Sequence, residues 1–126
     1  KEWLILAFIF FIGSLAGWLL ELIFSHFFQK KIIKENGKII LANAVQQLPR
    51  SVKIWQTAAD LEDDIDKKRR VLWRALEFIP NSVVLWKEAV SLEKEESAIL
   101  LLRRAVEQVP GCVELWLALA KLETYE

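Results

Sequence analysis

The later part of the chain repeats one pattern three times: AVQQLPRSVKIWQTAADLE (44–62), ALEFIPNSVVLWKEAVSLE (75–93) and AVEQVPGCVELWLALAKLE (105–123). Successive copies are offset by 31 and then 30 residues. Four residue types recur at fixed places: Ala44, Ala75 and Ala105; Pro49, Pro80 and Pro110; Trp55, Trp86 and Trp116; and Glu62, Glu93 and Glu123. Self-similarity at a period of about 20–50 residues is the signature of stacked repeats.

Each period predicts two helices with short breaks between them. Apolar residues follow helical spacing over 51–63 and again over 66–79, with an acidic connection between the two stretches. Pro80 cannot continue a helix internally, and Ser82 is well placed to begin the next one. We therefore expect an all-α, TPR-like solenoid over residues 38–126. Its first helix would cover about 38–48 and its last about 112–125, which leaves the array incomplete at both ends.

The recurring residues are expected to form the repeat core. A large Trp in every first helix would fill the space between neighbouring helices, and a small Ala in every second helix would permit close approach. The recurring Glu follows Trp by seven residues, two helical turns along the same face. Its expected partner is an Arg of a second helix, and full solvation is the alternative. The candidate partners are Arg69, Arg74 and Arg104.

The first 29 residues have a different composition and contain three formal charges, whereas the other 97 residues contain 31. From Trp3 to Leu20 there is no charge, a run of about 27 Å as a helix, which approaches the thickness of a bilayer core. Residues 1–29 therefore predict one membrane-spanning helix, with residues 3–28 in contact with lipid. Lysines are enriched directly after it, which places the repeats on the cytoplasmic side if the segment is native. Residues 30–37 are expected to be a basic linker that ends in a turn at Asn36-Gly37.

Small and acidic residues mark one face of the apolar segment. Gly13 and Gly17 have the Gly-x-x-x-Gly spacing that lets a second membrane helix approach closely. Glu21 lies one turn further along and would face a protein partner if it lay deep in the bilayer. The spacing of Gly13 and Gly17 predicts helix association through these two residues. Two alternatives stay open: glycine is common in membrane helices, and Glu21 can lie at the headgroup level.

At residues 37–126 the sequence resembles a known family. Trp, then Glu seven residues later, then Arg-Ala-Leu or Arg-Ala-Val and Pro, resembles the half-a-TPR (HAT) repeats of RNA-processing proteins. The strings VLWRALEFIPNSVVLWKEAVSLEKEESA and LLRRAVEQVPGCVELWLALAKLETYE are especially similar to the repeats of pre-mRNA splicing factors that bridge particles in the spliceosomal tri-snRNP. The resemblance implies a nuclear protein-protein interaction scaffold without catalysis or cofactor. Residues 1–36 have no counterpart in that family.

Four positions depart from the pattern of that family. Arg is expected where Trp73, Val84 and Ile99 stand, and Asn43 replaces the Arg of the Arg-Ala pair. The first three put apolar groups where charges would be solvated, which makes them a candidate contact surface for a membrane helix, a second copy or a bilayer. The alternative is that the middle helices of a solenoid are covered on two sides and need wide apolar faces.

Several kinds of chemistry have no support in the sequence. His26, in the apolar segment, is the only histidine, and Cys112 is the only cysteine, so one chain offers neither a histidine triad nor a Cys-based zinc site. We predict no catalytic residues, no metal and no cofactor. The 17 basic and 17 acidic residues give zero net charge, which argues against nucleic acid as a direct ligand.

Two functional hypotheses remain, and neither is an enzyme. The first is an interaction scaffold like that of the splicing factors, joined to a membrane helix in a fragment, a chimera or an engineered chain. The second is a single-pass membrane subunit or assembly factor whose repeats recruit a partner to a membrane complex. An RNA-binding repeat protein ranks below both. The first hypothesis favours the nucleus if the repeats decide the compartment, and the second favours a membrane.

Overall fold

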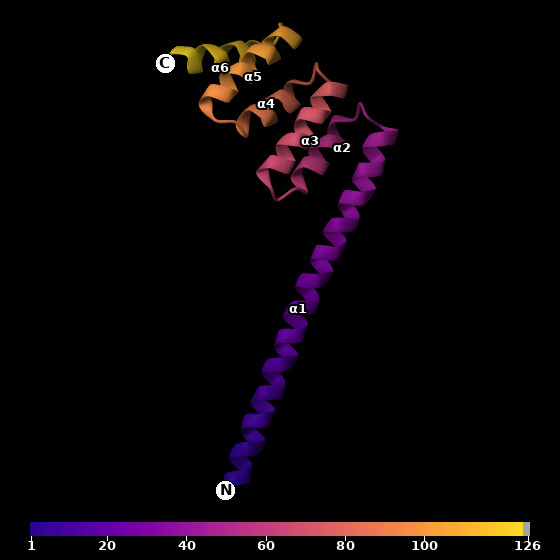
Figure 1. Cartoon of the computed structure of the whole chain (residues 1–126), viewed down its shortest axis with the longest axis vertical. Helices are drawn as coiled ribbons and strands as arrows, with labels where there is room; N and C mark the ends of the chain where they lie inside the picture. The colour runs from indigo at the N-terminus through magenta and orange to yellow at the C-terminus, as the bar shows by residue number, and fades with distance from the viewer. Residues whose placement is uncertain (125–126) are drawn as a thin grey trace. The chain divides into compact units, whose positions relative to one another are not determined.

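The computed structural model describes residues 1–124, without the side chains of residues 11 and 12. In this range every regular element is a helix: α1 (Glu2–Gln47), α2 (Val52–Asp60), α3 (Ile65–Phe78), α4 (Val83–Ser91), α5 (Glu95–Gln108) and α6 (Val113–Thr124) (Figure 1). The all-α prediction is confirmed. The predicted last helix and repeat region extend to Tyr125 and Glu126, which lie outside the described residues.

The chain divides into two units, Lys1–Gly37 and Lys38–Glu126. The expected linker is helical instead, because α1 continues through residues 30–37 and the turn at Asn36-Gly37 does not form. Glycine in a helix interior costs only about 1 kcal/mol relative to alanine, and the neighbouring Lys, Ile and Glu residues are compatible with a helix. No described glycine has a positive φ, the feature that would have favoured a turn there.

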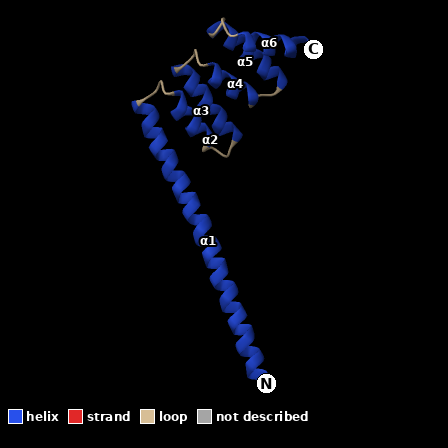
Figure 2. Ribbon diagram, turned by 180° about the vertical axis from the view of Figure 1, so that it is seen from behind, coloured by secondary structure: helices blue, strands red, loops and turns tan. Residues whose placement is uncertain are grey.

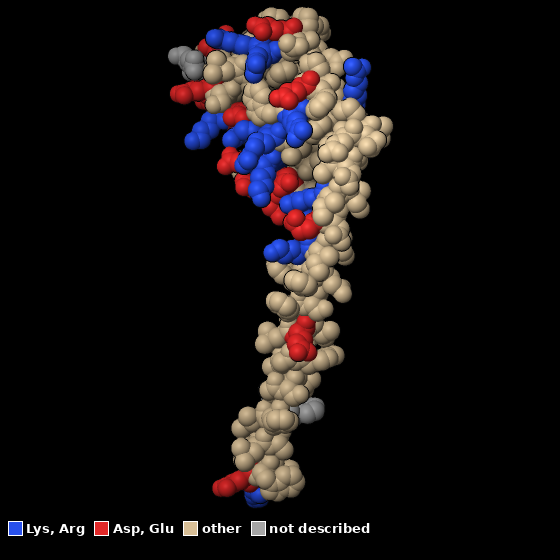
Figure 3. Space-filling model, turned by 45° about the vertical axis from the view of Figure 1, so that its right-hand side comes forward, with Lys and Arg blue, Asp and Glu red and all other residues tan. Residues whose placement is uncertain are grey.

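The first unit is a single apolar helix with exposed side chains. Trp3, Phe10 and Phe24 are among the large apolar side chains that lie on its surface. Lys, Arg, Asp and Glu are sparse along this segment in Figure 3. By length and composition, α1 is long and apolar enough to cross a membrane.

The second unit is a series of helices in which each packs against the next, from α2 to α6 (Figure 2). Side-chain caps begin two of these helices, since Asp64 Oδ1 accepts from the Asp66 N–H at 2.9 Å and Ser82 Oγ accepts from the Leu85 N–H at 3.4 Å. One apolar core runs through all five helices. Its fully buried larger side chains are Leu72, Leu85, Leu102 and Leu115.

Candidate interaction site

Each recurring tryptophan donates a hydrogen bond to the recurring proline six residues before it. The indole Nε1–H of Trp55 lies 2.8 Å from the Pro49 carbonyl oxygen. The same bond joins Trp86 to Pro80 at 2.7 Å, and the last copy, from Trp116 to Pro110, measures 2.9 Å. A buried indole needs a partner for its N–H, and here the turn before the helix supplies it. The bond explains why both residues recur with a constant interval.

The three tryptophans differ in burial. Trp55 and Trp86 are 3% and 4% exposed, and Trp55 also stacks on Phe78 with ring centroids 5.8 Å apart. Trp116 is 49% exposed, which differs from its predicted place in the core. The reason is its position in α6, because no later helix among the described residues covers that face.

The recurring alanines and prolines also have distinct places. Ala75 and Ala105 are completely buried, as close helix packing requires, whereas Ala44 is half-buried. Pro80 and Pro110 are exposed in turns instead of the predicted core, and Pro49 is half-buried. Their role in the repeat is to end a helix and to present a carbonyl to the indole.

Every recurring glutamate has a cationic partner on the preceding second helix, and for Glu93 this is Arg69, one of the three predicted partners. Glu62 Oε2 lies 3.2 Å from Lys38 Nζ, and Glu93 Oε1 lies 2.8 Å from Arg69 Nε. The second contact is electrostatic, because the Arg69 Nε–H is not aligned for a hydrogen bond. In the last repeat Glu123 pairs with Arg103 Nη2 at 2.6 Å.

The predicted partners Arg74 and Arg104 therefore lie elsewhere. Arg104 places its guanidinium carbon 5.8 Å from the centroid of the Trp73 ring, and Arg74 lines a cavity. Two glutamates find their cation 24 positions earlier in the sequence, and the equivalent position before Glu123 is Ile99. Because Ile99 carries no charge, an arginine one helical turn further along α5 takes over the pairing.

The three positions of the predicted contact surface do not share one environment. Ile99 is 5% exposed and belongs to the core, so it is not a surface residue. Trp73 is half-buried between α3 and α5, and Val84 on α4 is 48% exposed. The burial of Ile99 supports the alternative that a middle helix is covered on two sides and needs a wide apolar face. Of the three positions, Val84 is the one that is freely accessible.

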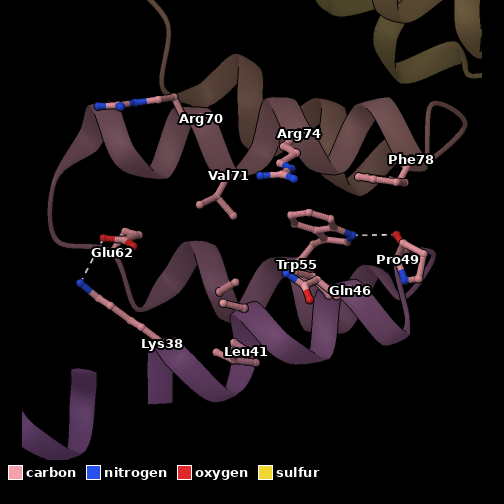
Figure 4. A pocket seen from close by; sticks show the side chains of 13 residues that line it. Lys38, Leu41, Gln46, Pro49, Trp55, Glu62, Arg70, Val71, Arg74 and Phe78 are labelled. Atoms are coloured by element: carbon pink, nitrogen blue, oxygen red, sulfur yellow. Dashed lines mark hydrogen bonds and ion pairs between the residues drawn. The ribbon is translucent and has the colours of Figure 1, made fainter. Parts of the chain in front are cut away.

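A cavity of about 400 Å³ lies within the second unit, between residues 38–46 of α1 and the helices α2 and α3. Figure 4 shows Val71 and Arg74 pointing from α3 into this space, opposite Leu41 of α1. The buried Trp55 forms part of its floor beside Phe78. Most of the lining is apolar, and its charged residues are Lys38, Arg70, Arg74 and Glu62.

Charge is distributed in pairs over the rest of the second unit. Blue and red side chains lie side by side on the face drawn in Figure 3. Gln56 of α2 donates to Glu88 of α4 at 2.5 Å, and Lys87 of α4 pairs with Glu114 of α6. The hydrogen bond that Lys87 donates to the Glu114 carboxylate, followed by the negative charge of Glu114, raises the pKa of Lys87 above 10.5. These contacts join each Trp-bearing helix to the next one.

The predicted membrane-packing face is open in the first unit. A side chain built at Gly13 or Gly17 would meet no atom within 4 Å, and Glu21 is exposed. The three residues are four apart along α1 and so share one face. Association through this face stays a prediction.

The described residues contain no group of three or more His, Cys, Asp or Glu side chains that could hold a metal ion. Cys112 is a half-buried free thiol in the turn before α6. In comparisons with known proteins, the chain matches no protein family and no curated protein sequence.

Sequence reasoning missed two features of this site. The indole-to-carbonyl bond was indicated by the constant six-residue interval between Pro and Trp. The cavity was indicated by a change in side-chain size at one repeat position, where Ala42 stands in the first copy and Trp73 in the second, each seven residues before the proline.

Proposed function

We propose that this chain is a non-catalytic protein-interaction scaffold built of HAT/TPR-like helical repeats and anchored in a membrane by residues 1–29. The observation that carries the proposal is that the recurring residues make the contacts within and between the helices of the repeats. Trp binds the turn carbonyl, Glu binds a cation of the preceding helix, and Ala lets helices approach. Residues that recur for stacking make an extended array, and such arrays present surfaces to partners.

Anchoring is supported by the first unit. Its long helix carries large apolar side chains on its surface, which in water would cost free energy in proportion to the exposed area. Backbone groups in a helix are already hydrogen-bonded, which is the condition for crossing lipid. Recruitment of a soluble partner to a larger membrane complex, as by a single-pass subunit or assembly factor, is the version of this function that uses both units.

A second candidate function rests on the resemblance of residues 37–126 to HAT repeats, most closely those of the sixth pre-mRNA-processing factor. It is a scaffold for pre-mRNA splicing in the nucleus. The spacing of Trp, Glu and Pro supports it. The apolar helix α1 opposes it, because that family has no membrane helix.

The anchoring part is tested by alkaline carbonate extraction of cell membranes. The full chain is expected in the membrane pellet. A variant with Leu15→Lys and Leu19→Lys should be extracted, since each lysine at the centre of a membrane helix costs about 2.5–3.5 kcal/mol. Lys30→Gln is the control and should stay in the pellet. A full chain that is soluble and monomeric without detergent, or that collects in the nucleus, would refute the membrane anchor.

The scaffold part is tested by a photo-crosslinking amino acid placed at exposed positions of the second unit. Val84 and Leu117 are exposed apolar positions, and Gln108 is an exposed polar position for comparison. Reproducible crosslinks to the same proteins from the apolar positions, and fewer from Gln108, are expected. Absence of any crosslinked protein from all three positions would contradict the proposal.

A further inference from the structure

The second helix of each repeat lies next to the second helix of the following repeat, and the array contains two such pairs, which can be compared position by position. Residues 38–47 of α1 precede α3 by one repeat, and α3 precedes α5 by one repeat. Counting back from each proline, Ala42 of α1 matches Trp73 of α3, and Arg74 of α3 matches Arg104 of α5. The same two positions therefore face each other twice, once with a small side chain and once with a large one.

Between α3 and α5 the position is filled. The Trp73 ring is half-buried, and the Arg104 guanidinium lies over it at 5.8 Å from the centroid. A cation over an indole face within about 6 Å is a favourable contact, because the ring presents negative potential to the charge. The chain thus contains its own example of an indole bound at this repeat position.

Between α1 and α3 the same position is empty. Ala42 and Arg74 both line the cavity of about 400 Å³, and Arg74 points into it in Figure 4. Neighbouring repeat positions differ less in side-chain size, since Leu41 matches Leu72, and Val45 is one methylene smaller than Leu76. Among the α1 positions that line the cavity, Ala42 therefore has the largest loss of side-chain volume relative to its counterpart one repeat later.

We infer that this cavity binds an aromatic side chain, an indole in preference, from an acidic segment of a partner protein. The inference rests on the proposed function as an interaction scaffold and names the chemistry of its partner. The incoming ring would take the place that Trp73 occupies one repeat later, in contact with Arg74. Lys38 in the lining is offset by its ion pair with Glu62, and Arg70 and Arg74 leave a net positive charge, so acidic residues beside the anchor would be attracted.

The dimensions of the cavity agree with such an anchor. Ligand pockets typically hold about 300–1,000 Å³, and aromatic side chains bury about 150–250 Å² each. The hot spots of protein interfaces are also enriched in aromatic side chains that lie in well-packed pockets. The remaining space would accept the backbone and small neighbours of the inserted residue.

The experiment measures the anisotropy of a fluorescein-labelled, capped peptide with the sequence Asp-Glu-Trp-Glu-Asp, titrated with the full chain in lipid nanodiscs. One peptide per chain is expected to bind. A matched peptide with Leu in place of Trp should bind at least tenfold more weakly. Ala42→Trp in the chain should abolish binding by filling the cavity, and Ala42→Leu provides a second filling variant with a smaller change.

The charge and the repeat equivalence are tested with three more variants. Arg74→Gln should weaken binding by about two- to thirtyfold, the range of a cation–π contact. Arg104→Gln is the matched control at a position that is already filled, and binding should be unchanged. Trp73→Ala should open a second cavity and raise the stoichiometry from one peptide to two.

Equal binding of the Trp and Leu peptides, or undiminished binding to both Ala42 variants, would overturn the inference. The proposed function fails by a different result, namely loss of membrane retention or of crosslinks from Val84 and Leu117. A chain that keeps those crosslinks but does not bind the Trp peptide would be a scaffold without this anchor pocket.

Discussion

Replacing Trp86 by Ala, beside the matched replacement of Trp116, separates the two roles that the recurring tryptophan combines. Both residues donate an indole hydrogen bond to a proline six residues earlier, at 2.7 and 2.9 Å. They differ in burial, with 4% of Trp86 exposed and 49% of Trp116. The pair therefore holds the hydrogen bond constant while the packing term changes.

The expected loss follows from these exposures. A buried aromatic residue replaced by alanine lowers the free energy of unfolding by about 3–5 kcal/mol, which we expect for Trp86→Ala. Trp116 buries about half as much, so Trp116→Ala should cost about 1.5–2.5 kcal/mol. The indole hydrogen bond contributes about 0.5–1.5 kcal/mol to each value.

The assay is urea unfolding in mild detergent, followed by circular dichroism at 222 nm. The long helix α1 gives a constant background if it stays folded in the micelle, and the slope of the transition should be the same in both variants. Hydrogen exchange in α4 and α5 locates the loss. Equal losses for the two variants, or a loss below about 1 kcal/mol for Trp86→Ala, would refute the packing described here.

Three further outcomes are expected. Glu114→Gln should lower the pKa of Lys87 toward 10.5 in an NMR titration, and an unchanged titration would contradict the pairing. Because the pKa is raised in the folded state, the pair contributes to the free energy of unfolding at lower pH, and this contribution is lost as pH rises through that pKa. Arg69→Met should reduce the free energy of unfolding by about 1 kcal/mol, since the glutamate it leaves behind is mostly buried; a change within the error of the urea titration would show that the ion pair is only marginal. Gly13→Ile with Gly17→Ile should weaken self- or hetero-association of α1 in a membrane two-hybrid assay, and unchanged association would exclude that face.

Much of the fold follows from local patterns. The period of 31 and 30 residues places the breaks at Pro49, Pro80 and Pro110, because proline cannot sit inside a helix. Two helices lie between each proline and the next, as expected, and α6 follows the last proline. The turn at Asn36-Gly37 was predicted from this dipeptide alone, and the prediction was wrong. The neighbouring residues are compatible with a helix, and one glycine in a helix costs little free energy.

Side-chain partners were harder to predict than helices. The sequence suggested an arginine of a second helix as the partner of each recurring Glu, with solvation as the alternative, but helix spacing cannot say which cation makes the contact. The partner depends on how one helix is rotated and shifted against the next, a tertiary quantity. Ile99 shows the limit clearly: its place in the repeat corresponds to Arg69, yet it is buried and Arg103 pairs with Glu123 instead.

The indole-to-carbonyl bond also governs where the repeat tolerates changes of length. Every turn that this bond closes has the same size, with four residues between α3 and α4 and four between α5 and α6. The connection on the opposite side has four residues after α2 but three after α4, and this difference accounts for the change of period from 31 to 30. Insertions and grafted loops therefore belong between α2 and α3 or between α4 and α5, whereas a single residue added between Pro80 and Trp86 would pull the donor away from its acceptor.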